Sequence, residues 1–178
     1  AQEEVDALRS FLNEGGKWFG LHGTNALIEF VGEMQIVDGL EIPGKTDTPN
    51  KNPELMELLG SRFVAHPPNM SIKVKVNDKS HPITKDLNDF EIFDEPYYCE
   101  FSDGIKVLLE SRYTDDADAY VNSSWKEDIP RPQMYLHKVG KGGVLYLMLG
   151  HCRGKYDMRP FMDECPVDRG GWDSEVFY

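Results

Sequence analysis

Lys17-Trp18-Phe19-Gly20-Leu21-His22-Gly23-Thr24-Asn25 is the stretch that decides the predicted fold. Its first half, residues 18–21, is a short apolar strand, and its second half is a sharp turn flanked by glycines. An amphipathic helix over residues 2–14 precedes the strand, and the apolar spacing of residues 25–34 predicts a second helix. Helix, buried strand, tight turn and helix are the repeating unit of a doubly wound α/β fold. We therefore expect a mostly parallel sheet flanked by helices.

The rest of the chain is predicted to form mainly short strands. Apolar alternation or short apolar runs predict strands at residues 63–65, 71–76, 90–93, 105–109, 133–139 and 144–149. The last two flank a glycine-rich turn and predict a β-hairpin near the C-terminal part, with its second arm central in the sheet. Pro53 begins a predicted short helix that runs through residue 59. The Gly- and Pro-rich segment 37–52 before it predicts a long surface loop.

Composition indicates one globular domain over residues 1–178. The chain is 40% hydrophobic and 28% charged, which is typical of a folded, soluble protein. Its 31 acidic and 19 basic residues give a net charge of −12, with no visible basic face. This charge argues against nucleic acid and anionic membranes as partners and favours a neutral or cationic one. The longest apolar run, residues 144–149, is far too short to span a bilayer.

The cysteines and the two ends of the chain give further expectations. Three cysteines without metal-knuckle spacing predict free thiols and a reducing, cytoplasmic compartment. The chain opens on a helix, whereas doubly wound domains usually open on a strand. It stops just after Val176-Phe177-Tyr178, which resembles the start of another element. We therefore expect one or more N-terminal strands and the last C-terminal element to be missing from this single domain.

Four side chains form the candidate site. His22, His66, Glu95 and His151 each follow a predicted strand, and each has a glycine or proline beside it. Taken singly, each residue is more often structural than functional. If the strands are parallel neighbours, however, their carboxyl ends fall on one rim of the sheet, where doubly wound folds bind ligands. We therefore predict that the four residues share a site.

Two kinds of chemistry remain open for this predicted site. Three imidazoles, His22, His66 and His151, are able to bind a divalent ion such as Zn²⁺ or Mn²⁺ that activates water. Without a metal, His22, His151 and Glu95 are able to act as general acid and base near neutral pH. Cys152 adjoins His151, but neighbours at a strand end point in opposite directions, which argues against a cysteine nucleophile.

The order and spacing of several short pieces resemble the trehalose-utilisation (ThuA-like) family. The fold of that family is related to the class I glutamine amidotransferases, which implies a flavodoxin-like sheet here. The matching pieces are Gly20-Leu21-His22-Gly23, the segment 60–67 that ends in His66-Pro67, His81-Pro82-Ile83-Thr84, Phe93-Asp94-Glu95-Pro96-Tyr97, and the segment 140–151 that ends in Gly150-His151.

The resemblance has consequences for chemistry. In an amidotransferase the turn after the strand carries a nucleophilic cysteine, and a late strand ends in the catalytic histidine. Here the turn carries His22, while His151 matches the late histidine. Glutamine hydrolysis through a thioester is therefore excluded. The family is linked to the use of trehalose and similar disaccharides through oxidised (keto) sugars.

We accordingly predict a protein of carbohydrate utilisation. It is expected to act on a disaccharide or keto-sugar derivative, as a hydrolase, isomerase or lyase, by His/carboxylate acid–base or metal-assisted chemistry. The alternative is a non-catalytic sugar-binding or interaction domain on the same fold. A homo-oligomer is compatible with either function. The candidate substrate-binding residues near the rim are Asn25, Tyr97, Tyr98, Trp125 and Arg153, although the indole of Trp125 either stacks against a ligand or caps the core.

Overall fold

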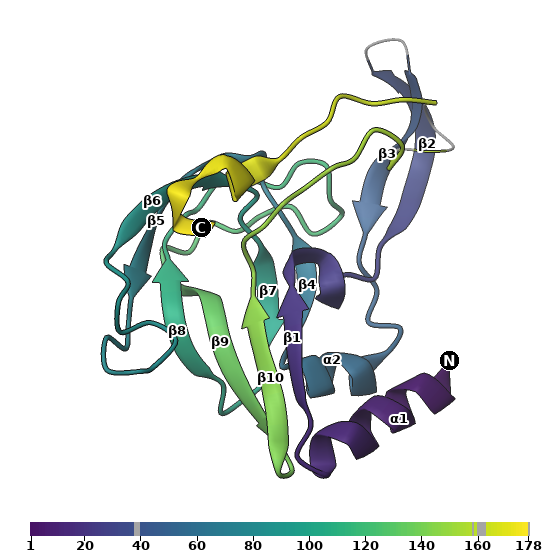
Figure 1. Ribbon diagram of the computed structural model, residues 1–178. Coiled ribbons are helices and arrows are strands. Elements are labelled where there is room, and N and C mark those ends of the chain that lie inside the picture. Colours follow the sequence, from purple (N-terminus) through teal and green to yellow (C-terminus); the bar gives the residue numbers. More distant parts are fainter. Residues whose placement is uncertain (38–39, 158, 160–162, 178) are drawn as a thin grey trace.

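A curved, six-stranded mixed sheet forms the centre of the computed structural model, which describes residues 1–37, 40–157, 159 and 163–177 (Figure 1). The two strands at one edge, β1 and β10, run parallel, and their residues pair from Lys17 with Gly143 to Leu21 with Leu147. Every other neighbouring pair in this sheet is antiparallel. In spatial order the strands are β1 (Lys17–Leu21), β10 (Gly142–Leu147), β9 (Arg131–Val139), β8 (Lys106–Ser111), β5 (Met70–Val76) and β6 (Phe90–Asp94).

The prediction of a doubly wound, mostly parallel α/β fold is therefore wrong. The described residues contain two α-helices, α1 (Gln2–Asn13) and α2 (Pro53–Leu59), and both lie near the same end of the sheet (Figure 1). A doubly wound sheet needs a helical crossover between successive parallel strands. The sheet instead has one parallel pair, and its remaining strands pair antiparallel. The flavodoxin-like expectation is wrong for the same reason.

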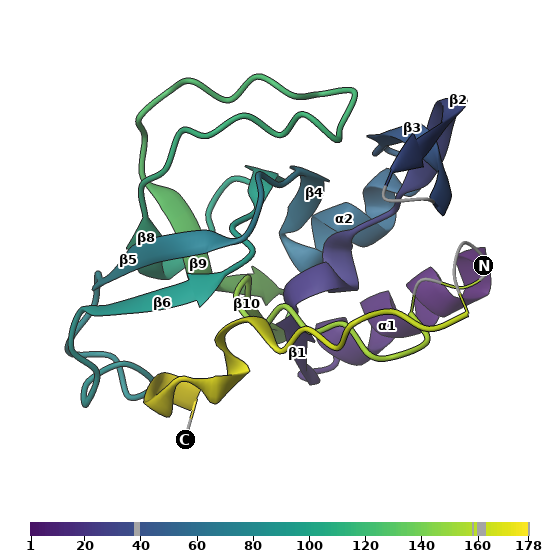
Figure 2. The same cartoon turned by 90° about the horizontal axis from the view of Figure 1, so that it is seen from above.

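The segment after His22 accounts for much of this error. Residues 25–34 were predicted to form a helix, but the chain makes one 3₁₀ turn, η1 (His22–Asn25), and then enters strand β2 (Glu29–Val37). Strand β2 pairs with β3 (Leu40–Asp47), which occupies part of the predicted surface loop. The hairpin stands away from the central sheet in both views (Figures 1 and 2).

The helical spacing in this segment was misleading because most of its large apolar side chains do not face the core. Phe30 and Met34 are each about half exposed, at 50% and 49%. Gly32 has a positive φ of 84°, and the pairing register shifts between Val31 and Met34. The sequence does carry a hairpin signal, Asp38-Gly39, a pair typical of two-residue hairpin turns. These two residues lie outside the described part of the chain.

Several local predictions are confirmed. The helix over residues 2–14 is α1, and α2 begins at Pro53 after Asn52, whose side chain accepts a hydrogen bond from Leu55 N–H at 3.1 Å. The predicted hairpin is formed by β9 and β10, and β10 lies between two neighbours as expected. The predicted strand at 63–65 is β4 (Ser61–Ala65). It pairs with β7 (Tyr98–Phe101), which the sequence patterns did not predict.

Strand β1 was predicted to be buried, and this is also wrong. It is an edge strand of the sheet, and Trp18 and Phe19 are 40% and 57% exposed. Gly20 is the buried residue of β1. The ring of Tyr146 on β10 covers it so closely that a Cβ atom at this position would lie 2.5 Å from that ring. A glycine at this position lets the two backbones pair over a bulky neighbour.

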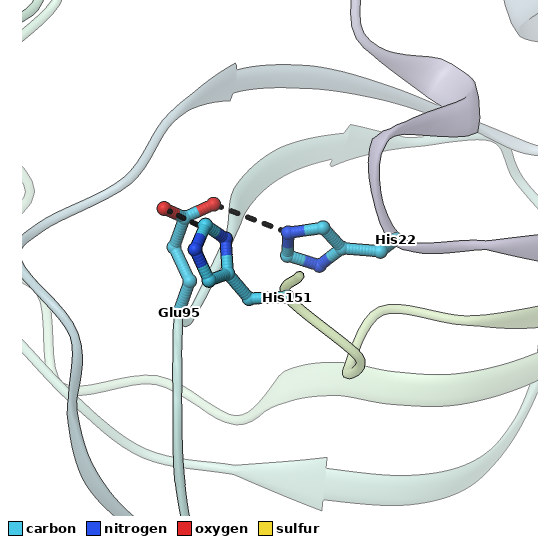
Figure 3. A group of neighbouring side chains, drawn as sticks. All are labelled: His22, Glu95 and His151. Atoms are coloured by element: carbon cyan, nitrogen blue, oxygen red, sulfur yellow. Dashed lines mark hydrogen bonds and ion pairs between the residues drawn. The ribbon is translucent and has the colours of Figure 1, made fainter. Parts of the chain in front are cut away.

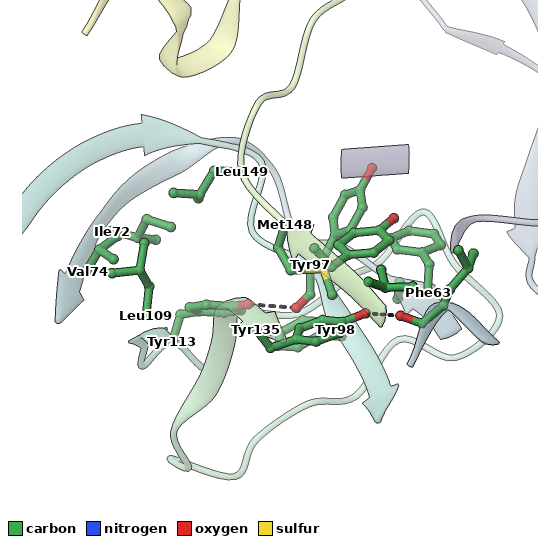
Figure 4. Close-up of a cluster of buried hydrophobic side chains, with 14 of the residues drawn as sticks. Phe63, Ile72, Val74, Tyr97, Tyr98, Leu109, Tyr113, Tyr135, Met148 and Leu149 are labelled. Carbon is green, nitrogen blue, oxygen red and sulfur yellow. Dashed lines mark hydrogen bonds between the residues drawn. The ribbon is translucent and has the colours of Figure 1, made fainter. Parts of the chain in front are cut away.

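Buried tyrosines make up a large part of the hydrophobic core (Figure 4). Tyr98, Tyr135 and Tyr146 are fully buried, and each hydroxyl donates a hydrogen bond to a backbone carbonyl. The Tyr113 hydroxyl likewise donates to the Tyr97 carbonyl at 2.6 Å. Since a buried hydroxyl without a partner is destabilising, these bonds fix each ring in one position.

The C-terminal segment returns to the sheet. A 3₁₀ turn, η2 (Gly170–Asp173), packs against β6, and η3 (Glu175–Phe177) follows it. Trp172 donates from its indole nitrogen to the Gly150 carbonyl at 2.9 Å. A side chain at Gly171 would collide with Ile92 and Asp94. The C-terminal segment therefore covers the end of β6. None of the described helices has the length and apolar character needed to cross a membrane.

Two glycines with the same backbone conformation test the packing of α2 against the sheet. Gly60 and Gly104 have positive φ values of 84° and 79°, so alanine is strained at either site by about 1–2 kcal/mol. At Gly60 a Cβ would also lie 2.8 Å from His137 and 3.0 Å from Tyr135, whereas nothing lies within 4 Å at Gly104. We expect Gly60→Ala to lower the free energy of unfolding by about 1–3 kcal/mol more than Gly104→Ala, measured by urea denaturation. Equal losses would show that α2 does not pack on the sheet as described.

Candidate active site

Four ionisable side chains from the ends of four strands meet at one point. His22 follows β1, His66 follows β4, Glu95 follows β6, and His151 lies just beyond β10. The Glu95 carboxylate contacts the imidazoles of both His22 and His151, one through each of its oxygens (Figure 3). The prediction that these four residues share one location therefore agrees with the geometry, while their roles stay predictions.

The strand ends meet for a different reason from the one expected. Only β1 and β10 are parallel neighbours, so His22 and His151 alone are brought together in the predicted way. Strand β6 lies at the opposite edge of the six-stranded sheet, and β4 belongs to a separate pair with β7. Curvature of the sheet carries the end of β6 back to the ends of β1 and β10 (Figures 1 and 2).

Glu95 is the centre of the cluster. His22 Nε2 lies 3.1 Å from Glu95 Oε2, and His66 Nε2 and His151 Nδ1 each lie 3.3 Å from Glu95 Oε1. The side chains are mostly buried, with 10% of Glu95, 13% of His22 and 16% of His151 exposed. His66 is more open, at 25%. The cluster is therefore largely desolvated and still in contact with solvent on the His66 side.

Each imidazole has a second partner on its other nitrogen. His22 Nδ1 lies 2.8 Å from the Met148 carbonyl, and His66 Nδ1 lies 2.7 Å from the Pro67 carbonyl. His151 Nε2 lies 3.4 Å from the carboxylate of Asp168, which arrives from the C-terminal segment. These outer contacts hold the three rings so that their inner nitrogens face Glu95.

The backbone at His22 is strained. Its φ of 42° makes it the one described non-glycine residue with positive φ. Tyr146 on β10 holds the turn, because its hydroxyl donates to the His22 carbonyl at 2.7 Å and accepts from Asn25 N–H at 2.8 Å. Strain of this kind persists only where the surroundings enforce it, and it is concentrated at functional sites.

Asp94 joins the two sides of the site. Its carboxylate is fully buried and accepts hydrogen bonds from the backbone N–H groups of Gly150 at 2.9 Å and His151 at 3.0 Å. It also accepts from the N–H of Glu95 at 2.8 Å. One side chain at the end of β6 thus fixes both the position of Glu95 and the segment that carries His151.

The charges of the cluster shift its ionisation. Burial alone would raise the pKa of Glu95, but contacts with His151 and His22 outweigh it and hold that pKa well below its usual range. In turn, the Glu95 carboxylate raises the pKa of His151. Burial lowers the pKa of His66. Glu95 therefore stays ionised, and His66 favours its neutral form.

Tyr97 is the predicted sugar-contacting residue that lies beside the cluster. Its ring centroid is 4.2 Å from that of His22 and 4.4 Å from that of Phe63. Only 6% of Tyr97 is exposed, so it forms a wall against which His22 packs. Its role in binding a sugar stays a prediction.

The structure does not bring the other four candidate substrate-binding residues to Glu95. Tyr98 and Trp125 stack on each other at 4.8 Å, with Arg131 over the Tyr98 ring, which agrees with the interpretation of Trp125 as a core cap. Asn25 is fully buried and donates to Ser61 Oγ at 2.6 Å. The Arg153 side chain donates to the Pro166 carbonyl at 3.4 Å. Their described contacts are structural, and a role in sugar binding stays untested for each.

Two carboxylates of the site lie outside the predicted four-residue cluster: Asp94, which forms with Glu95 a pair of adjacent carboxylates at a predicted strand end, and Asp168. Asp94 directly precedes Glu95, and its adjacency in the Phe93-Asp94-Glu95-Pro96 segment was the available signal. Asp168 lies in a loop-like tail where no pattern distinguishes it from other acidic residues. Its contact with His151 depends on how the C-terminal segment packs, which local sequence does not encode.

The fold and the cluster define a β-rich domain with a histidine–carboxylate site. Residues 42–165 match the family described as trehalose utilisation, ThuA. This match spans more than half of the chain, so the chain belongs to the ThuA family, and the predicted resemblance is confirmed. The family assignment links the protein to carbohydrate use. No match was found among curated proteins.

Two solved structures are similar to the chain. A ThuA-like protein from Bacteroides uniformis ATCC 8492 has 20% sequence identity and a TM-score of 0.56, with 89% of this chain and 58% of that chain covered. A ThuA-like protein from Parabacteroides merdae ATCC 43184 has 19% identity and a TM-score of 0.52, with 85% and 56% covered. The chain thus spans little more than half the length of these two proteins. At these identities the likeness supports the fold alone.

The bridging role of Asp94 is testable by stability measurements. Asp94→Ala removes the acceptor of three backbone N–H groups, and each buried donor left unpaired costs about 1–3 kcal/mol. We expect the free energy of unfolding to fall by at least about 3 kcal/mol in a urea titration. Asp103→Ala, at an exposed acidic residue, is the matched control and should change it by less than about 0.5 kcal/mol. A small loss for Asp94→Ala would contradict the described role.

Thiol labelling tests whether a cysteine is poised as a nucleophile. Burial raises the pKa of Cys99 to about 12, Cys165 is buried, and Cys152 is exposed. In the native protein at pH 8 we expect iodoacetamide to modify Cys152 and to spare Cys99 and Cys165, as read by mass spectrometry. In urea all three should react. Rapid native labelling of Cys99 would reopen the possibility of a cysteine nucleophile.

Proposed function

We propose that this ThuA-family domain acts on a disaccharide or a keto-sugar derivative, with Glu95, His22 and His151 as the reacting groups. The observation that carries the proposal is the convergence of two imidazoles on one desolvated carboxylate. Glu95 lies 3.1 Å from His22 and 3.3 Å from His151, and all three side chains are at least four-fifths buried. Groups of this kind transfer protons near neutral pH or activate water on a metal.

Three features support a sugar as the substrate. The family is described by trehalose utilisation. The aromatic ring of Tyr97 lies beside His22, and aromatic rings commonly line sites for neutral, ring-shaped ligands. The chain carries a net charge of −12, which suits an uncharged ligand better than an anionic one.

The cysteine chemistry of amidotransferases is not part of this proposal. The turn after β1 carries His22, and the partly buried Cys99 thiol, which lies 3.9 Å from Asn25 Nδ2, has a raised pKa. Proton transfer or water activation by the histidine–carboxylate cluster therefore replaces a covalent thioester step.

The alternative function is sugar binding without turnover. The strained backbone of His22, with a φ of 42°, is typical of active sites and of ligand clamps alike, so it marks a functional site under either function. Binding measured without product formation, for wild type and variants alike, would establish the alternative.

Turnover of trehalose and of its keto derivative provides the test, with products followed by mass spectrometry. We expect Glu95→Gln to lower kcat/KM by about 10²–10⁴-fold, because the isosteric amide keeps the shape of the side chain and cannot carry a proton. His81→Ala, in the turn between β5 and β6 and outside the cluster, is the histidine control and should retain full activity. Unchanged turnover in Glu95→Gln would refute the assignment of the reacting groups.

A further inference from the structure

The three histidines of the cluster lack enough protons for the contacts that they make. Each ring lies between two groups that only accept hydrogen bonds. His22 lies between Met148 O and Glu95, and His66 lies between Pro67 O and Glu95. His151 lies between Glu95 and Asp168. Six acceptor contacts thus face three rings, and a neutral imidazole has one N–H to donate.

The distances indicate which nitrogen carries each proton. The contacts to the backbone carbonyls, 2.8 Å for His22 and 2.7 Å for His66, are shorter than the contacts of the same rings to Glu95, 3.1 Å and 3.3 Å. A carbonyl accepts only from a protonated nitrogen, so Nδ1–H belongs on the carbonyl side in both rings. Their Nε2 lone pairs then face the Glu95 carboxylate, which itself has no proton to give.

Lone pairs directed at a carboxylate repel it unless a cation lies between them. Protonating all three rings would place three positive charges side by side in a largely desolvated cluster that holds two carboxylates, Glu95 and the one-third exposed Asp168. A single divalent ion removes the conflict for His22 and His151 with fewer charges. It takes up the lone pairs of His22 and His151 together with an oxygen of Glu95.

The donor spacing suits such an ion. Two ligand atoms about 2.0–2.1 Å from one tetrahedral ion lie about 3.3 Å apart. His22 Nε2 lies 3.1 Å from Glu95 Oε2 and His151 Nδ1 lies 3.3 Å from Glu95 Oε1, so each imidazole is at ligand spacing from one oxygen of the carboxylate. The three ligand atoms lie within 4.8 Å of one another, so the two imidazoles need to approach each other by no more than about 1.5 Å to close on an ion.

We propose that His22 Nε2, Glu95 and His151 Nδ1 bind one zinc-type divalent ion and leave its fourth coordination position open. Two imidazoles and one carboxylate are a ligand set typical of catalytic zinc sites, in which water or substrate takes the remaining position. The outer contacts complete the arrangement. The Met148 carbonyl orients His22, and Asp168 orients His151, as carbonyls and carboxylates orient metal-binding histidines.

His66 has a separate part in this proposal. His66 contacts one of the three proposed ligand residues, Glu95, through its Oε1 atom. His66 is also the most exposed histidine of the cluster. With its proton on Nδ1, the Nε2 atom is an acceptor for a water or sugar hydroxyl held at the open position. His66 therefore differs from His22 and His151 in lying beside the ion rather than binding it.

Metal titration of the chain, in the absence of any sugar, tests the site. The protein is stripped with a chelator and then titrated with Zn²⁺ against a chromophoric competitor, and with Co²⁺ to read the coordination geometry from its absorption. We expect one ion per chain, and no stoichiometric ion in Glu95→Gln or His151→Ala. Asp168→Asn should bind about 10–100-fold more weakly, because an outer partner is lost while the ligands remain.

Two matched controls locate the ion. Glu91→Gln changes an exposed carboxylate on the same strand, β6, and His81→Ala changes a histidine outside the cluster. Both should bind Zn²⁺ as wild type does. His66→Ala should keep the ion and lose turnover. If folded wild-type protein, checked by circular dichroism, binds none of Zn²⁺, Co²⁺ and Mn²⁺, or if Glu91→Gln loses the ion as Glu95→Gln does, the proposal is overturned.

This inference concerns the same site as the proposed function but fails separately from it. If the ion binds and no disaccharide or keto-sugar is turned over, the proposed substrate is wrong and the metal site stands. If stripped protein turns over the sugar as fast as loaded protein, the metal has no part in the reaction and the acid–base function stands.

Discussion

The buried carboxylate of Asp94 is the constraint on which the rest of the site depends. It accepts hydrogen bonds from Glu95 in its own strand and from Gly150 and His151 beyond β10. Strands β6 and β10 are not neighbours in the sheet, because β9, β8 and β5 lie between them. Their ends meet only because the sheet curves, and Asp94 holds the curved arrangement closed. Asp94 is fully buried and does not contact a reacting substrate, yet it positions Glu95 and His151, which line the site.

The remaining supports of the site follow from this closure. Once the end of β6 lies against β10, Glu95 faces the turn after β1, where Tyr146 holds His22 in its strained conformation. Trp172 then packs behind Gly150, and Asp168 reaches His151. The site therefore rests on tertiary hydrogen bonds between distant segments, and no single element contains two of its four central residues.

The sequence allowed elements with strong local signals to be predicted. Asn52, Pro53 and Gly60 define the ends of α2 by capping, fixed backbone angle and left-handed conformation, all of which act within a few residues. The glycine-rich turn between β9 and β10 acts in the same way. Likewise, His22, His66, Glu95 and His151 were recognisable because each directly follows a strand and has a glycine or proline beside it.

What the sequence could not provide is the pairing of strands. Apolar spacing at Phe30 and Met34 fits a helix, but without a core surface to cover, the segment pairs with β3 instead. Strand direction depends on which distant segment lies alongside, so the expectation of a mostly parallel sheet holds only for the β1–β10 pair among the described strands. Asp168 lies 17 positions beyond His151 in sequence and belongs to the site only through its contact with that ring. No sequence periodicity distinguishes Asp168 from the other acidic residues around it.

The parallel pair of β1 and β10 also determines when the site forms. Lys17 pairs with Gly143, so the intervening chain must be brought together before this contact exists, at a loop-closure cost of about 4 kcal/mol from chain length alone. The β9–β10 hairpin closes over a two-residue turn and carries almost none of that cost. From chain entropy alone we expect strand β1 to pair after the hairpin has formed, because long-range pairing of this kind slows folding. Because His22 follows this edge strand, we expect it to join Glu95 and His151 late, and detachment of β1 alone would dismantle the cluster while the other strands stay paired.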